Sequence, residues 1–179
     1  YAIAIKFALV PTLLIQPFTL WWFPKRFSML KEDNGKVLNA HFAMIGAVIS
    51  VLICGSLGLL GPLLIAWLTP VEYHAAINIL PWLLLCTLLK MLSDLLNLGC
   101  FVDKNTQLQM NINLFSCGLG GLLLVILVPL FMIKGALISL IAANVMRMAL
   151  FYYFSQKKVY LPYKLPYLYS AISAAFIAT

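Results

Sequence analysis

The chain has 179 residues, of which 64% are hydrophobic and 9% are charged, and its mean hydropathy is +1.01. Soluble globular domains are about 45–50% apolar and about 25% charged, so a soluble fold could not bury this much apolar surface. The composition therefore predicts a membrane protein. The net charge of +7 comes mostly from basic residues in short connectors, which argues against nucleic-acid binding.

Six apolar segments follow one another along the chain. They are residues 1–24, 40–68, 75–101, 108–133, 135–154 and 165–179. All but the last reach the roughly 20 residues that a helix needs to cross the hydrocarbon core. The pattern predicts an all-α fold: a polytopic bundle of about six transmembrane helices, forming a single lobe over residues 1–179 whose last span is truncated.

Both ends of the chain lie within apolar runs. The first run begins at Tyr1 without an initiator methionine, and the last ends at Thr179. We therefore expect the chain to be a piece of a longer multi-span protein. The first run is not a signal peptide, because it lacks a basic start and contains Pro11 and Pro17.

Basic residues are divided unevenly between the connectors. Eight Lys or Arg residues fall in the first, third and fifth connectors, which are residues 25–39, 102–107 and 155–164. The other two connectors, residues 69–74 and 134–135, carry one. Because cytoplasmic loops hold the excess of Lys and Arg, the first set is predicted to face the cytoplasm.

Small residues recur every fourth position in two segments, and such stripes let helix backbones approach closely in lipid. The stripes are Gly46–Ser50–Cys54–Gly58 and Gly135–Ser139–Ala143. They predict a packed bundle, although small residues are also simply common in membrane helices. The four cysteines show no paired spacing and the two histidines lie near the ends of spans, so no metal site, cofactor or catalytic residue is expected.

The third segment carries two charges, Lys90 and Asp94, in a run of leucines. Each costs roughly 2.5–3.5 kcal/mol at the centre of a membrane helix. The two residues are four apart, so they share a helix face and are expected to pair. Two interpretations stay open: a structural pair that joins helices, or groups that line a transport pathway.

Lys6 and Arg147 raise the same question in other spans. Lys6 is expected near the outer leaflet, where it either snorkels to the surface or lines a cavity. Arg147 is seven residues from the cytoplasmic end of its segment, so snorkelling or a cavity role would each account for it. The first segment is also interrupted by proline, which kinks helices, and a kinked helix with a basic residue is a plausible moving part.

Three stretches resemble the carboxy-terminal lobe of bacterial polysaccharide flippases, the O-antigen and repeat-unit exporters of the multidrug/oligosaccharidyl-lipid/polysaccharide exporter superfamily. They are "YAIAIKFALVPTLLIQPFTLWWFPKRFSML", "LGPLLIAWLTPVEYHAAINILPWLL" and "VPLFMIKGALISLIAANVMRMALFYYFSQKK". The resemblance covers nearly the whole chain but less than half of a full flippase. It implies two helical lobes around a central cavity, so an amino-terminal lobe of the same chain would be the missing partner.

The resemblance also implies a function. The substrate would be an undecaprenyl-diphosphate-linked oligosaccharide, flipped across the bacterial inner membrane by alternating access. Lys6 matches the lysine of the family's helix and is the first choice for a diphosphate contact. Lys90 and Arg147 are further candidates on chemical grounds, since a membrane-embedded cation can hold an anionic head group. Asp94 would tune Lys90 or take part in ion coupling.

Two other classes of protein remain as alternatives. One is a membrane-embedded enzyme of polysaccharide biosynthesis, but such an enzyme needs a cluster of catalytic groups that the short connectors do not supply. The other is a drug or ion-coupled exporter of the same superfamily, whose cationic substrate would favour acidic residues. Three basic residues and one acidic residue are the intramembrane candidates here, which favours an anionic substrate and a protein that is not an enzyme.

Overall fold

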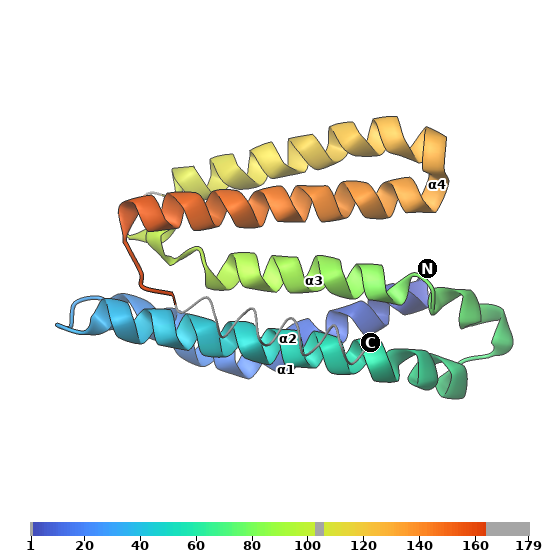
Figure 1. Ribbon diagram of the computed structural model, residues 1–179, viewed down its shortest axis with the longest axis horizontal. Helices are drawn as coiled ribbons and strands as arrows, with labels where there is room; N and C mark the ends of the chain where they lie inside the picture. Colours follow the sequence, from blue (N-terminus) through green and yellow to red (C-terminus); the bar gives the residue numbers. More distant parts are fainter. Residues whose placement is uncertain (1, 103–105, 164–179) are drawn as a thin grey trace.

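The computed structural model describes residues 2–102 and 106–163, and all regular structure in these ranges is helical (Figure 1). The elements in chain order are α1 (Ala2–Met29), α2 (Gly35–Leu68), η1 (Val71–Ala76), α3 (Leu80–Leu95), η2 (Leu98–Phe101) and α4 (Gln107–Lys158). The all-α prediction is confirmed for the described residues. The expected sixth span, residues 165–179, lies outside them.

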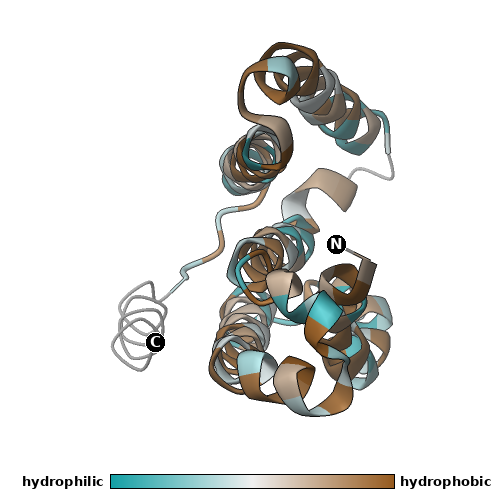
Figure 2. Ribbon diagram, turned by 90° about the vertical axis from the view of Figure 1, so that its right-hand side faces the viewer, coloured by the Kyte–Doolittle hydropathy of each residue, from teal (hydrophilic) through white to brown (hydrophobic). Residues whose placement is uncertain are grey.

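Among the described residues, three helices, α1, α2 and α4, are long and apolar enough to cross a membrane. At most 28% of the most apolar stretch of each is buried inside the molecule. Large apolar side chains therefore cover the outside of the bundle, as expected for a protein whose solvent is lipid. In the end-on view, brown, apolar residues occur along every coloured helix, interspersed with white and teal ones (Figure 2).

Helix α4 is a hairpin of two arms rather than one rod (Figure 1). The chain reverses at Met132, whose φ of 50° is unusual for a residue other than glycine. The reversal comes two residues before the turn expected at residues 134–135. The first arm, residues 107–131, and the second arm, residues 133–158, then pack against each other along the bundle.

Helix α3 is the central helix, and it contacts α1, α2 and α4. It has 16 residues, which at 1.5 Å per residue gives about 24 Å, less than the roughly 30 Å of hydrocarbon. The prediction of one continuous helix over residues 75–101 is therefore wrong. Pro81 sits in the first turn, where its missing N–H does no harm, and the helix ends at Leu95, two residues before Asn97.

Helix α1 continues five residues past its predicted end and takes in Lys25 and Arg26. Both had been assigned to the first connector. Three prolines, Pro11, Pro17 and Pro24, lie inside the helix without ending it. Proline removes one backbone hydrogen bond at each place, and packing against α2 and α3 holds the helix together regardless.

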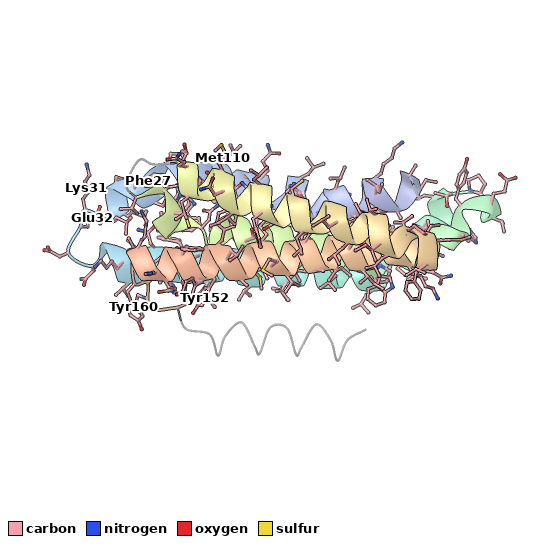
Figure 3. The ribbon with its side chains drawn as sticks, turned by 90° about the horizontal axis from the view of Figure 1, so that it is seen from above. Phe27, Lys31, Glu32, Met110, Tyr152 and Tyr160 are labelled. Atoms are coloured by element: carbon pink, nitrogen blue, oxygen red, sulfur yellow. The ribbon has the colours of Figure 1, made fainter. Side chains whose placement is uncertain are left out.

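The connectors gather at two opposite ends of the bundle. At one end, Ala40, Leu98 and Leu161 form a shared cluster, and Lys31 and Tyr160 lie near it although they are far apart in sequence (Figure 3). At the other end lie η1 and the tip of the α4 hairpin (Figure 1). The two groups match the basic and the non-basic connectors, while the assignment of the basic end to the cytoplasm stays a prediction.

The small-residue stripes lie where helices meet. Gly46, Ser50 and Cys54 are buried, and a Cβ on Gly46 would stand 2.7 Å from the Phe18 ring of α1. In the hairpin, a Cβ on Gly120 would stand 2.9 Å from the Cβ of Ala143. The predicted packing role is therefore confirmed at these positions, whereas Gly58 faces open space.

Candidate functional site

An ion pair joins α3 to the second arm of α4. Arg147 Nη2 donates to Asp94 Oδ1 at 2.9 Å, and the two side chains are 19% and 37% exposed. The guanidinium also lies over the ring of Phe151, 5.4 Å from its centre. The prediction that Asp94 pairs with Lys90 is therefore wrong. Helix α4 brings the Arg147 guanidinium to the carboxylate instead, and the planar guanidinium matches a carboxylate better than an ammonium group does.

Lys90 stays next to this pair. It lies one turn before Asp94 on α3, and its side chain is exposed. Asp94 is therefore paired with Arg147, while Lys90 lies one turn away on the same helix and the buried Arg26 is bonded to Asn97, three residues after Asp94.

Arg26 is the residue of this group that the sequence analysis missed as a site candidate. It is 5% exposed, and its Nη1 donates to Asn97 Oδ1 at 3.1 Å. Aromatic rings surround the guanidinium, with centres 4.6–5.1 Å away; they belong to Phe23, Phe27 and Phe101. Arginine favours such stacked positions because its planar cation is weakly hydrated.

A sequence signal for Arg26 does exist. The run "FPKRF" places phenylalanines three residues before and one residue after the arginine, within a helix-forming stretch. In an exposed connector, two phenylalanine rings would have nothing to pack against. Asn39 of α2 fixes the same region, since its Nδ2 donates to the Arg26 carbonyl at 3.1 Å and to the Gly35 carbonyl at 3.0 Å.

Lys6 does not join the cluster. It is exposed on α1, between Ala4 and Ala8, which pack against Leu80 of α3 near the η1 end of the bundle. Lys6 is 20 residues from Arg26 on the same helix, or about 30 Å along its axis. The structure thus brings together Lys90, Asp94 and Arg147 from the predicted set and leaves Lys6 apart.

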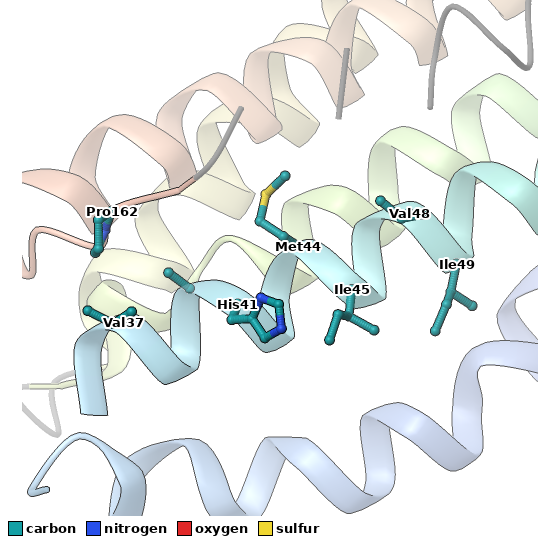
Figure 4. A pocket seen from close by; sticks show the side chains of 8 residues that line it. Val37, His41, Met44, Ile45, Val48, Ile49 and Pro162 are labelled. Atoms are coloured by element: carbon teal, nitrogen blue, oxygen red, sulfur yellow. The ribbon is translucent and has the colours of Figure 1, made fainter. Parts of the chain in front are cut away.

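The best-defined groove lies elsewhere, on α2, and has a volume of about 370 Å³ (Figure 4). Its walls are almost entirely apolar, with His41 as the polar exception; the lining residues are Val37, Ala40, His41, Met44, Ile45, Val48, Ile49 and Pro162. Just beyond, Tyr163 follows α4, and burial raises the pKa of its phenol above the usual value. His41 is the one titratable group among the residues that line the groove, and no acid, thiol or second histidine stands beside it there.

The described residues offer little for metal binding or thiol chemistry. Within residues 2–102 and 106–163, no three His, Cys, Asp or Glu side chains come close enough to hold a metal ion. The cysteines Cys54 and Cys100 are buried, and Cys86 is half-buried. The cluster around Asp94 is therefore the place where charged groups from different helices meet.

No family model, curated protein or solved structure matches this chain. The resemblance to polysaccharide flippases therefore rests on the sequence stretches themselves, and the site on its own geometry.

Proposed function

We propose that the chain forms one lobe of a bacterial exporter that flips a polyprenyl-diphosphate-linked oligosaccharide across the inner membrane by alternating access. The observation that supports it is the Arg147–Asp94 ion pair between α3 and α4, with Lys90 one turn away on α3 and Arg26 of α1 bonded to Asn97, three residues after Asp94. Six spans and a second, amino-terminal lobe belong to this proposal. The family resemblance supplies the identity of the substrate.

The charge balance favours an anionic ligand. In a helical bundle with an apolar exterior, an unpaired cation costs several kcal/mol, and such residues usually pair or face a water-filled cavity. Asp94 compensates Arg147 by direct contact, whereas Lys90 is exposed and lies beside an already paired carboxylate. A diphosphate would compensate the remaining charge.

The ion pair also has a role when no substrate is bound. The Asp94 carboxylate holds the Arg147 guanidinium, so that the free site does not contain a lone desolvated cation. A diphosphate entering beside Lys90 then competes with Asp94 for the same arginine. Since α3 and α4 carry the two partners, exchange of the arginine between carboxylate and phosphate would alter the contact between these helices.

Lys6 takes a separate part in this proposal. The roughly 30 Å that separate it from Arg26 along α1 equal about the thickness of the hydrocarbon core, so in this proposal it would lie near the other membrane face. It would attract the diphosphate where the substrate leaves the bundle, rather than hold it beside Asp94.

Lys90 offers the sharpest test, because its replacement leaves the Asp94–Arg147 pair intact. We would replace Lys90 by Gln in the full-length protein and measure surface polysaccharide in cells that lack the native exporter. Loss of one charged contact to a phosphate, about 1.5–3 kcal/mol, should lower export by roughly tenfold or more. Lys36→Gln, an exposed lysine in the first turn of α2, is the matched control and should export normally.

Protein level in the membrane is measured for both variants. Normal export by a well-expressed Lys90→Gln protein would overturn the assignment of the cluster to substrate binding.

A further inference from the structure

The connector that follows α4, residues 159–163, is fastened to the rest of the bundle. Both backbone groups of Leu161 bond to the Gln156 side chain: the N–H donates to Oε1 at 3.1 Å, and the carbonyl accepts from Nε2 at 3.0 Å. The Leu161 side chain is 2% exposed and packs against Ala40 of α2 and Leu98 of η2. The connector therefore has a fixed course, which carries the chain from α4 to the start of α2.

This course leads to the apolar groove on α2. Pro162 forms part of the groove wall, and it lies beside the end marked by Val37 (Figure 4). Tyr163, the next residue, packs against the cluster that contains Ala43 and Ala47 of α2. The polypeptide is thus held at one end of the groove by its own connector.

The groove suits an apolar helix in direction and in length. Its α2 wall runs from Val37 to Ile49, a step of 12 residues or about 18 Å, and it leads away from the basic end of the bundle. Residues 165–179 contain no Asp, Glu, Lys or Arg, and as a helix they would measure about 22 Å.

The groove also suits this segment in side-chain size. The α2 wall carries mostly branched or long side chains, among them Met44, Ile45 and Val48. Seven of the residues 165–179 are alanine, serine or threonine, including the run Ser173–Ala174–Ala175. Small residues on one helix let it approach another closely in lipid, so the two surfaces are complementary.

We propose that residues 165–179 dock in the groove as a helix parallel to α2. Only Lys164 separates the fixed Tyr163 from this segment, which gives the segment a high effective concentration at the groove that a second copy of the chain lacks. The sixth span then packs against α2 rather than against the arms of α4. The groove is in that case an internal contact of the lobe and not a place for a ligand.

Paired cysteines in the full-length protein, with its native cysteines replaced by serine, test the docking and its direction. A parallel course that starts with Pro162 beside Val37 and His41 brings Ala171 near Val48 and Leu168 near Ile45. Copper phenanthroline in native membranes should therefore join Val48→Cys to Ala171→Cys, and Ile45→Cys to Leu168→Cys. A protease site inserted between α2 and α3 gives the readout, because the two fragments stay together only when the cysteines of one chain are joined.

The matched control combines Leu63→Cys with Ala171→Cys. Leu63 is exposed on α2 but lies 15 residues, or about 22 Å, beyond Val48. This pair should leave the fragments separate. Membrane level and detergent-purified size are measured for every variant, and the two groove pairs are independent, so that one that fails to fold leaves the other.

Two results would overturn the proposal. If neither groove pair cross-links in folded protein, lipid fills the groove instead. If the cysteines join two chains, seen as a dimer band before protease is added, a second copy occupies it.

Discussion

Breaking the Asp94–Arg147 pair should destabilise the bundle, and the partner that couples to Asp94 can be identified by double substitution. We would compare Asp94→Asn, Arg147→Gln and the double variant in the full-length protein. Asp94→Asn removes the charge and keeps the shape, whereas Arg147→Gln also shortens the side chain and loses the contact with Phe151, which the double-substitution cycle cancels. A second cycle tests Lys90 as the partner of Asp94: it compares Asp94→Asn, Lys90→Gln and the variant with both substitutions.

The expected coupling free energy between Asp94 and Arg147 follows from how far the two side chains are buried. Opposite charges about 4 Å apart attract by about 4 kcal/mol at an effective dielectric constant of about 20. Removal of one partner from a fully buried pair costs about 3–5 kcal/mol, whereas exposed pairs contribute less than about 1 kcal/mol. Asp94 is 37% exposed and Arg147 19% exposed, so we expect an intermediate coupling of about 2 kcal/mol.

Unfolding of the purified protein in mixed micelles, titrated with a denaturing detergent, measures these free energies. Each single variant should lose about 2 kcal/mol, and the double variant should lose about the same rather than twice as much. The cycle with Lys90 should show less than about 0.5 kcal/mol of coupling. Additive losses for Asp94 and Arg147, or a larger coupling to Lys90, would refute the assignment of the pair.

Three further predictions test the fold. Cysteines introduced at Asn34 and Thr69 should differ in reaction with an impermeant reagent added to intact cells, with only Thr69 labelled, because the basic connectors are predicted to be cytoplasmic. Gly120→Leu should lower the free energy of unfolding by about 1–3 kcal/mol through overpacking between the arms of α4, whereas Gly118→Leu, in open space, should cost little. Arg26→Lys should lower it by about 1 kcal/mol in the same detergent titration, since lysine loses the planar stacking between aromatic rings.

Local pattern was enough to predict where most of the chain is helical. Long apolar runs with few charges leave a backbone no alternative to internal hydrogen bonds, so α1, α2 and the arms of α4 could be anticipated. The reversal near Met132 was also close to its predicted place, because the basic and glycine residues at 134–135 mark a turn. The ends of α3 were misjudged, since the apolar run continues through η2 while the helix does not.

The sequence alone could not identify Arg147 as the partner of Asp94. A carboxylate with a lysine one turn away is the ordinary pattern of a pair within a helix. Arg147 is 53 residues further along, and only the packing of the second arm against α3 brings it within 2.9 Å. Arg26 was missed for a related reason: its assignment to a connector assumed that α1 ends before it, whereas the helix carries it into a ring of phenylalanines.

Helix α3 is short and charged, so the Asp94–Arg147 ion pair matters for the assembly of the bundle. Its 16 residues include eight leucines, worth roughly 4 kcal/mol towards insertion, against roughly 6 kcal/mol for Lys90 and Asp94. Helix α3 alone is therefore both too short and too charged to be stable across a bilayer. Arg147 supplies the counter-charge only when the second arm of α4 is in place. The central helix of the bundle thus depends on the helix that follows it, and any ligand that draws Arg147 away from Asp94 acts on the least self-sufficient helix of the fold.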